Sequence, residues 1–386
     1  MEKIYLLLIV AVLFSCNTAN KNAKTDDYET INLNGMFREN SGIEMADLID
    51  SLRIIKLETT EESIVGNISK IMLSTNGNYI IGDDVQGKGI IIFDKNGKFI
   101  KRISNGNGSG ELRYYTDFDF DYKKAVLLVG QEDYIMKFDE NGNYLGDYDA
   151  ETGQKIKVNF HYSDFKISDD GFIFKTLVTQ NNGNALSEKY MAITDKNCNV
   201  QKIAITKFAK FNYSSSNFDY SGRCFSIPLS DTIYNYAMGK IRPKYVLDYS
   251  DCKEDYDYTN IPDFTQFMAK MMKSKNYFFD GNYQETENTQ FFLMMRFQSA
   301  PMFIFRNKQT KQIHCGDFLF FNHKLVPSFS LPISTTRNGY FVSLIDFSEK
   351  NKKLESSNLI SETERNYVTD FSEEDNPLIV LFKFKQ

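Results

Sequence analysis

Short apolar or alternating runs follow one another along most of the chain, and Asn, Gly or Asp separates each run from the next. Between residues 68 and 103 the runs are "ISKIMLS", "NYIIGDD", "GIIIFD" and "GKFIKRI". Between residues 116 and 148 they are "TDFDFDY", "AVLLVGQ", "YIMKFD" and "GNYLGDY". Runs of this length bounded by turn residues are typical of strands joined by hairpins. Each interval therefore predicts a four-stranded antiparallel meander.

The two intervals are copies of one unit, because their turns place Asp94 and Asp139 45 residues apart. A third copy reads "YSDFKIS", "GFIFKTLV", "KYMAITD" and "NVQKIAI", with Cys198 where the first two turns have glycine. A repeat of this length with four strands per unit is typical of a β-propeller, in which each unit is one blade.

Three further units follow with weaker similarity. The fourth holds "FNYSSSNF", "RCFSIPL", "DTIYNYAM" and "PKYVLDY", the fifth "NYFFDGNY", "TQFFLMMRF", "PMFIFRN" and "KQIHCGD", and the sixth "SFSLPIST", "NGYFVSLID" and "NPLIVLFKFK". Two segments interrupt the strands. Near 262–274 the apolar residues recur at helical spacing, which predicts a packing helix, and a charged insertion near 348–368 is also expected to be helical.

The sixth unit has three strands, whereas "LRIIKLET" at 52–59 precedes the first unit and has no partner there. If this N-terminal strand pairs with the C-terminal unit, the ring closes and a free sheet edge disappears. The sequence thus predicts an all-β fold, a six-bladed β-propeller of four-stranded antiparallel blades.

The repeated Asp-x-Asn-Gly tetrapeptides have the composition of a calcium-binding loop but not its spacing. An EF-hand loop needs glycine at position 6 and a glutamate at position 12. Here Gly97 and Gly142 stand at position 4, and position 12 is Asn105 or Ala150. Asn-Gly tolerates positive φ and Asp accepts backbone hydrogen bonds, so the tetrapeptide predicts a tight hairpin turn.

The chain begins with a targeting segment. The apolar run from Ile4 to Phe14 is too short to span a membrane comfortably and is typical of a signal-peptide core. The letters "LFSC" resemble the lipobox of bacterial lipoproteins, which implies cleavage before Cys16 and acylation of that residue. The polar letters that follow suit a flexible tether. We expect a signal peptide at 1–15, a tether and N-terminal extension at 16–47, and the propeller at 48–386.

Several segments between residues 48 and 386 carry a family likeness: "IIKLET", "SIVGNISKI", "FDKNGKFI", "GNGSGEL" before "DFDFD", "SDTIY", "PKYVLDY" and "EEDNPLIVLFKFK". As a set they resemble the six-bladed β-propeller lipoproteins of Bacteroidetes, which are relatives of the NHL-repeat propellers. The resemblance implies a six-bladed propeller, and it transfers no catalytic residue to this chain.

The residues after Cys16 bear on where in the cell envelope the protein is located. Asn17 does not match the enterobacterial signal for retention in the inner membrane. Surface lipoproteins of Bacteroidetes tend to carry acidic residues shortly after the cysteine, whereas Asp26 and Asp27 come late here. We expect an outer-membrane lipoprotein that faces the periplasm, with surface display as the alternative.

The composition limits the classes of ligand and of site that this chain can have. The net charge of −6 argues against a nucleic-acid partner, and only three histidines are present. Four cysteines remain beyond the lipobox, and none forms Cys-x-x-Cys. In an exported chain they are either disulfide-bonded or buried as thiols. They are Cys198, Cys224, Cys252 and Cys315.

The carboxylates of "TDFDFDY" are the candidate metal ligands. If this run is an innermost strand, alternation puts Asp117 and Asp119 on the same side of it. Related six-bladed enzymes of the lactonase type hold calcium in the central channel with Asp, Asn and Glu oxygens. Asn338, in "TRNGY" of the sixth unit, is a further candidate ligand. Calcium is therefore the cofactor to test, and solvated or turn-capping carboxylates are the alternative.

Arginine and tyrosine supply a second set of candidates. Arg113 and Tyr115 adjoin the strand of acidic residues, and the Gly-rich "SNGNGSGE" at 104–111 lies just before them. Such crossings between blades lie on the face where propellers usually bind ligands. Arg223, Arg296 and Arg337 come from later units. Arginine and tyrosine at a channel mouth suit an anionic or sugar-like ligand.

Two classes of function follow. The first is a membrane-anchored binding or scaffolding protein of the cell envelope, which would recognise a glycan, a peptide or an envelope protein through its channel face. The second is a calcium-dependent hydrolase or lyase with its site in the channel. The sequence favours the first, because it holds no convincing catalytic set.

Overall fold

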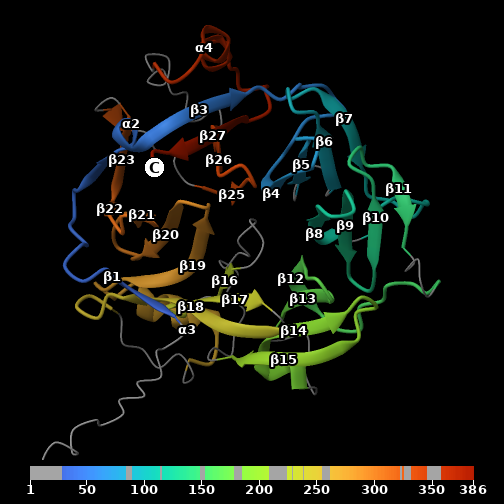
Figure 1. Ribbon diagram of the computed structural model, residues 1–386, viewed down its shortest axis with the longest axis horizontal. Coiled ribbons are helices and arrows are strands. Elements are labelled where there is room, and N and C mark those ends of the chain that lie inside the picture. Colours follow the sequence, from blue (N-terminus) through green and yellow to red (C-terminus); the bar gives the residue numbers. More distant parts are fainter. Residues whose placement is uncertain are drawn as a thin grey trace, which may run out of the picture.

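The computed structural model describes residues 28–83, 89–113, 115–147, 153–177, 185–207, 224–227, 229–237, 239–253, 261–321, 324–325, 332–345 and 358–386. Six sheets stand around a common centre, and each has four strands in this part of the chain (Figure 1). The six-bladed β-propeller predicted from the sequence is therefore confirmed.

Blades 1, 2, 3 and 5 follow the chain from the innermost strand outwards (Figure 1). Blade 1 consists of β4 (Ile68–Leu73), β5 (Tyr79–Asp83), β6 (Gly89–Phe93) and β7 (Phe99–Ile103), and blade 2 of β8 (Tyr115–Asp121), β9 (Val126–Gln131), β10 (Ile135–Phe138) and β11 (Tyr144–Gly146). Blade 3 consists of β12 (Tyr162–Ile167), β13 (Gly171–Thr176), β14 (Lys189–Asp195) and β15 (Val200–Thr206). Blade 5 consists of β19 (Phe278–Glu285), β20 (Thr289–Met295), β21 (Met302–Asn307) and β22 (Ile313–Gly316). A short 3₁₀ turn, η1 (Ala185–Glu188), precedes β14. All of these strands overlap runs that the hydrophobic pattern predicts.

Blade 6 closes the ring with strands from both ends of the chain. Its order is β25 (Ser334–Thr335), β26 (Phe341–Ile345), β27 (Leu378–Phe384) and β3 (Ile49–Ile55). The predicted pairing of the N-terminal strand with the C-terminal unit is confirmed. The strand ends at Ile55 rather than at residue 59, because the chain then turns to blade 1, where the Glu58 N–H donates to Gly97 O over 2.7 Å.

Blade 4 is completed by a strand from outside the expected repeat. Its order is β16 (Cys224–Ser226), β17 (Thr232–Ala237), β18 (Lys240–Asp248) and β1 (Glu29–Asn32). β1 runs parallel to β18, which is feasible because the two strands are far apart in sequence and need no hairpin. The strand expected at 211–218 lies outside the described residues.

The N-terminal extension continues along the outside of the ring. β2 (Gly42–Glu44) pairs in parallel with β23 (Phe318–Phe321), which also pairs with β24 (Lys324–Leu325), and α2 (Met45–Leu48) leads into β3. The extension thus joins blade 4, a small sheet after blade 5, and blade 6. The sequence pattern did not predict β1, β2, β23 or β24.

The Asp-x-Asn-Gly segments form hairpin turns, as predicted. Asp94 Oδ1 accepts the N–H groups of Asn96 and Lys98 at 2.8 and 2.9 Å, and Gly97 has φ +85°. The turn at Asp139 has the same pattern of hydrogen bonds. Burial raises the pKa of Asp139, but its hydrogen bonds with Asn143 and Asn141 outweigh this, so the pKa lies below its usual value.

Two helices lie outside the sheets. α3 (Phe264–Met271) is capped at its N-terminus by Asp263, whose side chain accepts the Gln266 N–H, and it buries Phe267 and Met271. This agrees with the helix predicted at 262–274. α4 (Glu362–Thr369) is the described part of the second predicted insertion, and residues 346–357 lie outside the described set. No helix among the described residues is long and apolar enough to cross a membrane.

The hydrophobic core lies between neighbouring blades rather than at the centre. Between blades 1 and 2, for example, Ile80, Ile90 and Ile92 pack against Phe118 and Val129, all fully buried. Alternating strand residues face opposite sides of a blade, so each blade contributes to the core on both of its sides. The innermost strands are consequently held between apolar layers and present their edges to the centre of the ring.

Candidate functional site

The acidic strand predicted as a metal site is innermost in blade 2, but its carboxylates are buried. Asp117 and Asp119 of β8 are 5% and 1% exposed. Both side chains point to one side of the strand, as alternation requires. Each carboxylate is shared between a lysine and a backbone N–H of the next blade.

Asp117 connects three blades. Its Oδ1 lies 2.9 Å from the Nζ of Lys70 in β4 of blade 1, and its Oδ2 accepts the N–H of Phe165 in β12 of blade 3 over 2.9 Å. The Lys70 ammonium also donates to the carbonyl oxygen of Phe118. The ion pair is almost completely removed from solvent.

Asp119 repeats the arrangement two residues further along β8. Its Oδ1 lies 2.8 Å from the Nζ of Lys166, and its Oδ2 accepts the N–H of Ile167 over 2.8 Å. Lys166 and Ile167 both belong to β12, so this carboxylate joins blade 2 to blade 3.

The free edge of β12 explains why these positions carry aspartate. β12 pairs only with β13 in its sheet, so its inner N–H groups have no strand partner. Unpaired backbone donors in a buried place are costly. The two carboxylates accept the N–H groups of Phe165 and Ile167, which satisfies the edge and fixes the spacing of the blades. We refer to Lys70, Asp117, Asp119 and Lys166 as the inner ladder.

Burial and charge act against each other in the inner ladder. Burial raises the pKa of Asp117 to about 6, although Lys70 and the Phe165 N–H lower it. Burial likewise lowers the pKa of Lys70, but the carboxylates of Asp117 and Asp119 outweigh this and raise it above its usual value. The raised pKa of Lys70 favours its ammonium form beside the Asp117 carboxylate. Removing one partner of such a buried pair leaves an uncompensated charge.

These contacts take away the support for calcium at β8. A calcium site needs several oxygen ligands that converge on one point. The carboxylate oxygens of Asp117 and Asp119 instead accept hydrogen bonds, and lysine ammonium groups occupy the positions where a cation would sit. In the described part of the chain, no three His, Cys, Asp or Glu side chains gather as a metal site would require.

Arg113, unlike the buried Asp117 and Asp119, lies on an exposed loop. The loop joins β7 to β8, at the face of the ring where the innermost strands begin, which we call the start face. It is internally ordered: Gly106 N–H donates to Leu112 O over 3.0 Å, and Glu111 Oε2 accepts the Gly108 N–H over 2.7 Å. The Nε of Arg113 donates to Asn107 Oδ1 over 3.2 Å, so the exposed guanidinium is held in place.

Tyr115, the first residue of β8, is half-buried beside blade 1. Its hydroxyl lies 3.4 Å from the Oγ of Ser69, and a Cβ added at Gly82 would lie 2.3 Å from that hydroxyl. Glycine is therefore required at position 82 for the tyrosine to reach across. Tyr115 packs between blades, next to Arg113 in the chain.

Arg337 and Asn338 lie at the other end of the innermost strands, which we call the end face. They form the exposed turn between β25 and β26. The guanidinium carbon of Arg337 is 3.9 Å from the ring centroid of Tyr122, which directly follows β8. Arg113 precedes β8 and Arg337 contacts its far end, so the structure does not bring these two arginines to one site.

Arg296 lies at the start-face end of blade 5, because Met295 before it pairs with Phe278, the first residue of β19. Arg296 forms an ion pair of 2.7 Å with Glu39 of the N-terminal extension and lies over the ring of Tyr277 at 5.4 Å. It secures the extension to blade 5. Arg223 lies outside the described residues, as does the lipidation candidate Cys16.

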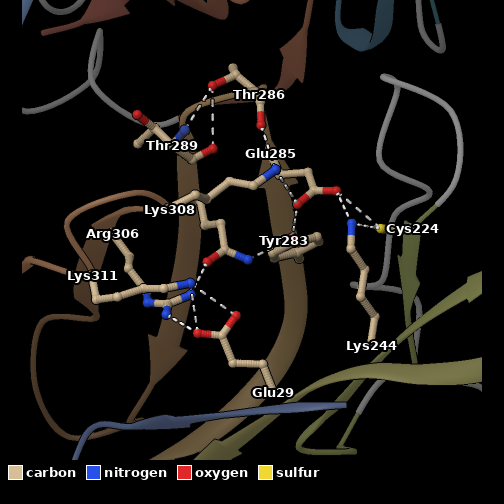
Figure 2. A network of polar contacts seen from close by, with 11 residues as sticks. Glu29, Cys224, Lys244, Tyr283, Glu285, Thr286, Thr289, Arg306, Lys308 and Lys311 are labelled. Carbon is tan, nitrogen blue, oxygen red and sulfur yellow. Dashed lines mark hydrogen bonds and ion pairs between the residues drawn. The ribbon is translucent and has the colours of Figure 1, made fainter. Parts of the chain in front are cut away.

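A second polar network links blades 4 and 5, and the sequence analysis did not single it out (Figure 2). Glu285, at the end of β19, is its centre. Its Oε1 lies 2.6 Å from Lys244 Nζ and 3.1 Å from Cys224 Sγ, and its Oε2 accepts the Tyr283 hydroxyl over 2.8 Å and lies 3.2 Å from Lys308 Nζ. Burial raises the pKa of Glu285, but Lys244 and Lys308 outweigh it, so the pKa is lowered.

The same network reaches the N-terminal strand (Figure 2). Tyr283 accepts from Gln290, whose Oε1 accepts an N–H of Arg306 over 2.6 Å, and Arg306 pairs with Glu29 of β1. Lys311 lies 3.0 Å from the same carboxylate. β1 therefore pairs with blade 4 through its backbone and with blade 5 through its first side chain.

Comparisons with known proteins agree with this architecture. The profile of a domain of unknown function, DUF4934, matches residues 28–383. The chain belongs to the DUF4934 family. The match begins one residue before β1 and so includes the part of the N-terminal extension that holds β1 and β2. No curated protein matches the sequence.

A solved structure from Bacteroides fragilis shares the fold of this DUF4934 chain. A Bacteroides fragilis protein named as an exported protein superposes with a TM-score of 0.73 at 17% identity, covering 92% of this chain and 100% of that one. A DUF4221 family member from Bacteroides vulgatus gives a TM-score of 0.49 at 15% identity, over 87% of this chain and 98% of that one. The likeness to the Bacteroides fragilis protein, at 17% identity, shows the fold alone.

The DUF4934 sequence contains signals for the polar networks that the motif search did not use. Lys70 and Lys166 occupy interior positions of apolar strands, "ISKIML" and "YSDFKI", where a lysine must be paired if it is buried. Glu285 ends β19, in which all residues but one are buried. Lysine in one innermost strand and aspartate in the next is a pattern that predicts ion pairs between blades.

Proposed function

We propose that this DUF4934 protein is a lipid-anchored binding protein of the bacterial envelope, as the resemblance to NHL-like propeller lipoproteins implies. It recognises a glycan or peptide ligand with acidic or hydroxyl groups through the start face of its propeller. The observation that carries the proposal is Arg113: an exposed guanidinium on an ordered glycine-rich loop at the entrance to the innermost strand of blade 2. A fixed cation on a rigid scaffold suits recognition.

Two observations support the proposed location in the cell envelope. The apolar run Ile4–Phe14 followed by Cys16 has the form of a lipoprotein signal, and the Bacteroides fragilis neighbour is named as an exported protein. We place the lipid anchor on Cys16 in the outer membrane, with the propeller in the periplasm. Membrane fractionation tests this directly: Cys16→Ala should move the protein from the membrane pellet to the soluble fraction. Unchanged sedimentation would contradict the anchor.

The side of the membrane is a separate question with its own experiment. Protease added to intact cells should leave a periplasmic protein uncut, and it should degrade the protein after the outer membrane is permeabilised. Degradation in intact cells would show surface display instead. Either result leaves the binding proposal standing, because the ligand could come from either side.

We prefer a binding function to a calcium-dependent hydrolase or lyase, because the carboxylates that would bind the calcium already form ion pairs with lysines. The test is a glycan array and a peptide library probed with the purified mature chain. We expect saturable binding to a defined ligand, lost in Arg113→Ala and kept in Arg337→Ala, whose exposed turn lies on the end face. Equal loss in both variants, or no binding at all, would contradict recognition by the start face.

A further inference from the structure

We propose that Cys224 and Lys244 are a redox-sensitive pair that oxidation joins by a covalent cross-link. The inference concerns the network between blades 4 and 5 (Figure 2) and does not depend on the proposed ligand or on the membrane anchor. Cys224 lies on β16 and Lys244 on β18, the two strands on either side of β17. A bond between them would staple blade 4 across its middle strand.

The geometry brings three reactive groups together. The Lys244 Nζ is 2.9 Å from Cys224 Sγ and 2.6 Å from Glu285 Oε1, and the sulfur is 3.1 Å from that same oxygen. A nitrogen–sulfur distance of 2.9 Å equals the usual N–H···O separation of about 2.9 Å although sulfur is larger than oxygen. No intervening group separates the two atoms that would bond.

Two charges of opposite sign lie beside the sulfur: the Glu285 carboxylate accepts the S–H hydrogen of Cys224 and favours the thiol, whereas the Lys244 ammonium favours the reactive form. An adjacent ammonium stabilises a thiolate, and the thiolate is the form that oxidants attack. Burial lowers the pKa of Lys244, but the sulfur of Cys224 and the carboxylate of Glu285 outweigh it and raise the pKa well above its usual value. The side chain of Lys244 is 29% exposed, so a small oxidant can approach along it, whereas Cys224 itself is buried.

The other cysteines have a different environment. Burial raises the pKa of Cys252 and of Cys315 to about 12, and burial raises that of Cys198 still further. Within the described residues, none of the three has a lysine ammonium within hydrogen-bond distance of its sulfur, whereas Cys224 has one. They are therefore internal controls for reactivity in the same molecule.

The reaction balances with hydrogen peroxide as the oxidant. The thiolate attacks one peroxide oxygen, the O–O bond breaks, and Cys224 becomes a sulfenic acid as hydroxide leaves. The hydroxide takes a proton from the Lys244 ammonium and becomes the first water. The free amine then attacks the sulfur, the S–OH bond breaks, and the departing hydroxyl leaves as the second water with a proton from the nitrogen. Overall the ammonium, the thiolate and one peroxide give an N–S bond and two waters. Sulfur is oxidised by two electrons and peroxide is reduced by two.

With dioxygen as the oxidant the same two side chains can retain one oxygen. The ammonium, the thiolate and one dioxygen then give an N–O–S bridge and one water: the O–O bond breaks, dioxygen takes up four electrons, and the sulfur and the nitrogen each lose two. Both products join the lysine nitrogen to the cysteine sulfur, and both remove the positive charge of Lys244. Glu285 keeps the ammonium of Lys308 and the hydroxyl of Tyr283 as partners, so its carboxylate remains compensated after the reaction.

The experiment treats the purified mature chain with hydrogen peroxide, alkylates it, digests it with trypsin and measures the peptides by mass spectrometry. Lys244 cannot be cleaved once it is linked. We expect peptide 224–240 to disappear and to be found joined to peptide 241–253, with the loss of two hydrogen atoms, or with that loss and the gain of one oxygen. Dithiothreitol should restore the separate peptides.

Lys244→Arg is the matched control, because it keeps a cation beside Glu285 but offers no amine to form the bond. The joined peptides should be absent in Lys244→Arg and in Cys224→Ser, and the melting temperature should rise on oxidation only in the wild type. If wild-type Cys224 instead goes to sulfinic or sulfonic acid while Lys244 remains cleavable, the proposal is wrong. It is also wrong if Cys198, Cys252 or Cys315 forms the reducible adduct in its place.

Discussion

The ammonium nitrogen of Lys166 lies 2.8 Å from the carboxylate of Asp119, with both side chains more than nine-tenths buried. The second oxygen of that carboxylate accepts the N–H of Ile167, which follows Lys166 in β12. One aspartate therefore neutralises a lysine and completes the strand edge beside it. Asp117 does the same for Lys70 and Phe165, which makes β8 the strand that ties blades 1, 2 and 3 together.

Replacing Asp119 should destabilise the propeller strongly. In Asp119→Asn the geometry is nearly kept but the Lys166 ammonium becomes an uncompensated buried charge, so we expect a loss of about 3–5 kcal/mol. Chemical denaturation followed by tyrosine fluorescence or circular dichroism measures the change.

The matched control is a pair of the same types on the surface. Lys123 and Asp169 form an ion pair between blades 2 and 3 with side chains 78% and 77% exposed. Exposed pairs contribute about 0–1 kcal/mol, so Asp169→Asn should be nearly neutral. Similar effects of Asp119→Asn and Asp169→Asn would show that the inner ladder contributes little.

Closure of the ring depends on the packing of β27 as well as on its pairing with β3. Phe382 is fully buried, with its ring centroid 5.6 Å from that of Phe341 and 5.7 Å from that of Phe384. Phe382→Ala should cost about 3–5 kcal/mol through lost burial and the cavity left behind. Phe264→Ala, at a position 46% exposed on α3, should stay within about 0.5 kcal/mol of the wild type. The free energies of unfolding of both variants, measured at equilibrium, test this prediction.

Asp280 gives a prediction about pH. Burial raises the pKa of this β19 carboxyl to about 7, although the Asn282 N–H and a backbone hydrogen bond of its own lower it. Between the ordinary aspartate pKa and 7 the folded state holds a proton that the unfolded state has lost. Stability should therefore fall as pH rises from about 4 to about 7. Asp280→Asn should remove this loss and be more stable than the wild type at pH 8, by on the order of a few kcal/mol.

The comparison at pH 4 is the control for Asp280→Asn. There the wild-type carboxyl is protonated in the folded state, so asparagine and aspartic acid are close in charge and size. The two proteins should then differ much less than at pH 8. A stability difference that does not change between pH 4 and pH 8 would be inconsistent with titration of Asp280.

The N-terminal strand should loosen when its ionic contact to blade 5 is lost. Glu29→Gln removes the partner of the buried Arg306 guanidinium, while the backbone pairing of β1 with β18 is unchanged. We expect faster hydrogen exchange at residues 29–32 and unchanged exchange in blades 1 to 3. Lys311→Gln, at the exposed side of the same carboxylate, should have little effect. If Glu29→Gln exchanges as the wild type does, the contact does not secure the strand.

The blades could be predicted from the sequence because their signal is local. Alternating runs, Asp-Asn-Gly turns and a repeat of fixed length are all read within one unit, and the count of strands in the sixth unit required the closing strand at the other end. β1 and β2 were not predictable in this way, since "ETIN" and "GIE" are short and polar. Their parallel pairing with β18 and β23 is a tertiary choice with no hairpin to reveal it.

The candidate site was only partly predictable for a related reason. The spacing of Asp117 and Asp119 correctly placed both carboxylates on one side of β8. It did not show that Lys70 and Lys166 from other blades fill the space beside them, because partners between blades are set by packing and not by spacing. Arg113 precedes the innermost strand of blade 2, whereas Arg337 follows the innermost strand of blade 6, so the two arginines lie on opposite faces of the ring.

The most direct test of the central claim, that the inner carboxylates hold the blades and no metal, is the melting temperature of the purified chain in calcium and in EDTA. We predict the same melting temperature in both solutions for the wild type, and an equal decrease in both for Asp119→Asn. A wild type that melts lower in EDTA and recovers with calcium, while Asp119→Asn no longer responds, would contradict the account and restore a metal site at β8.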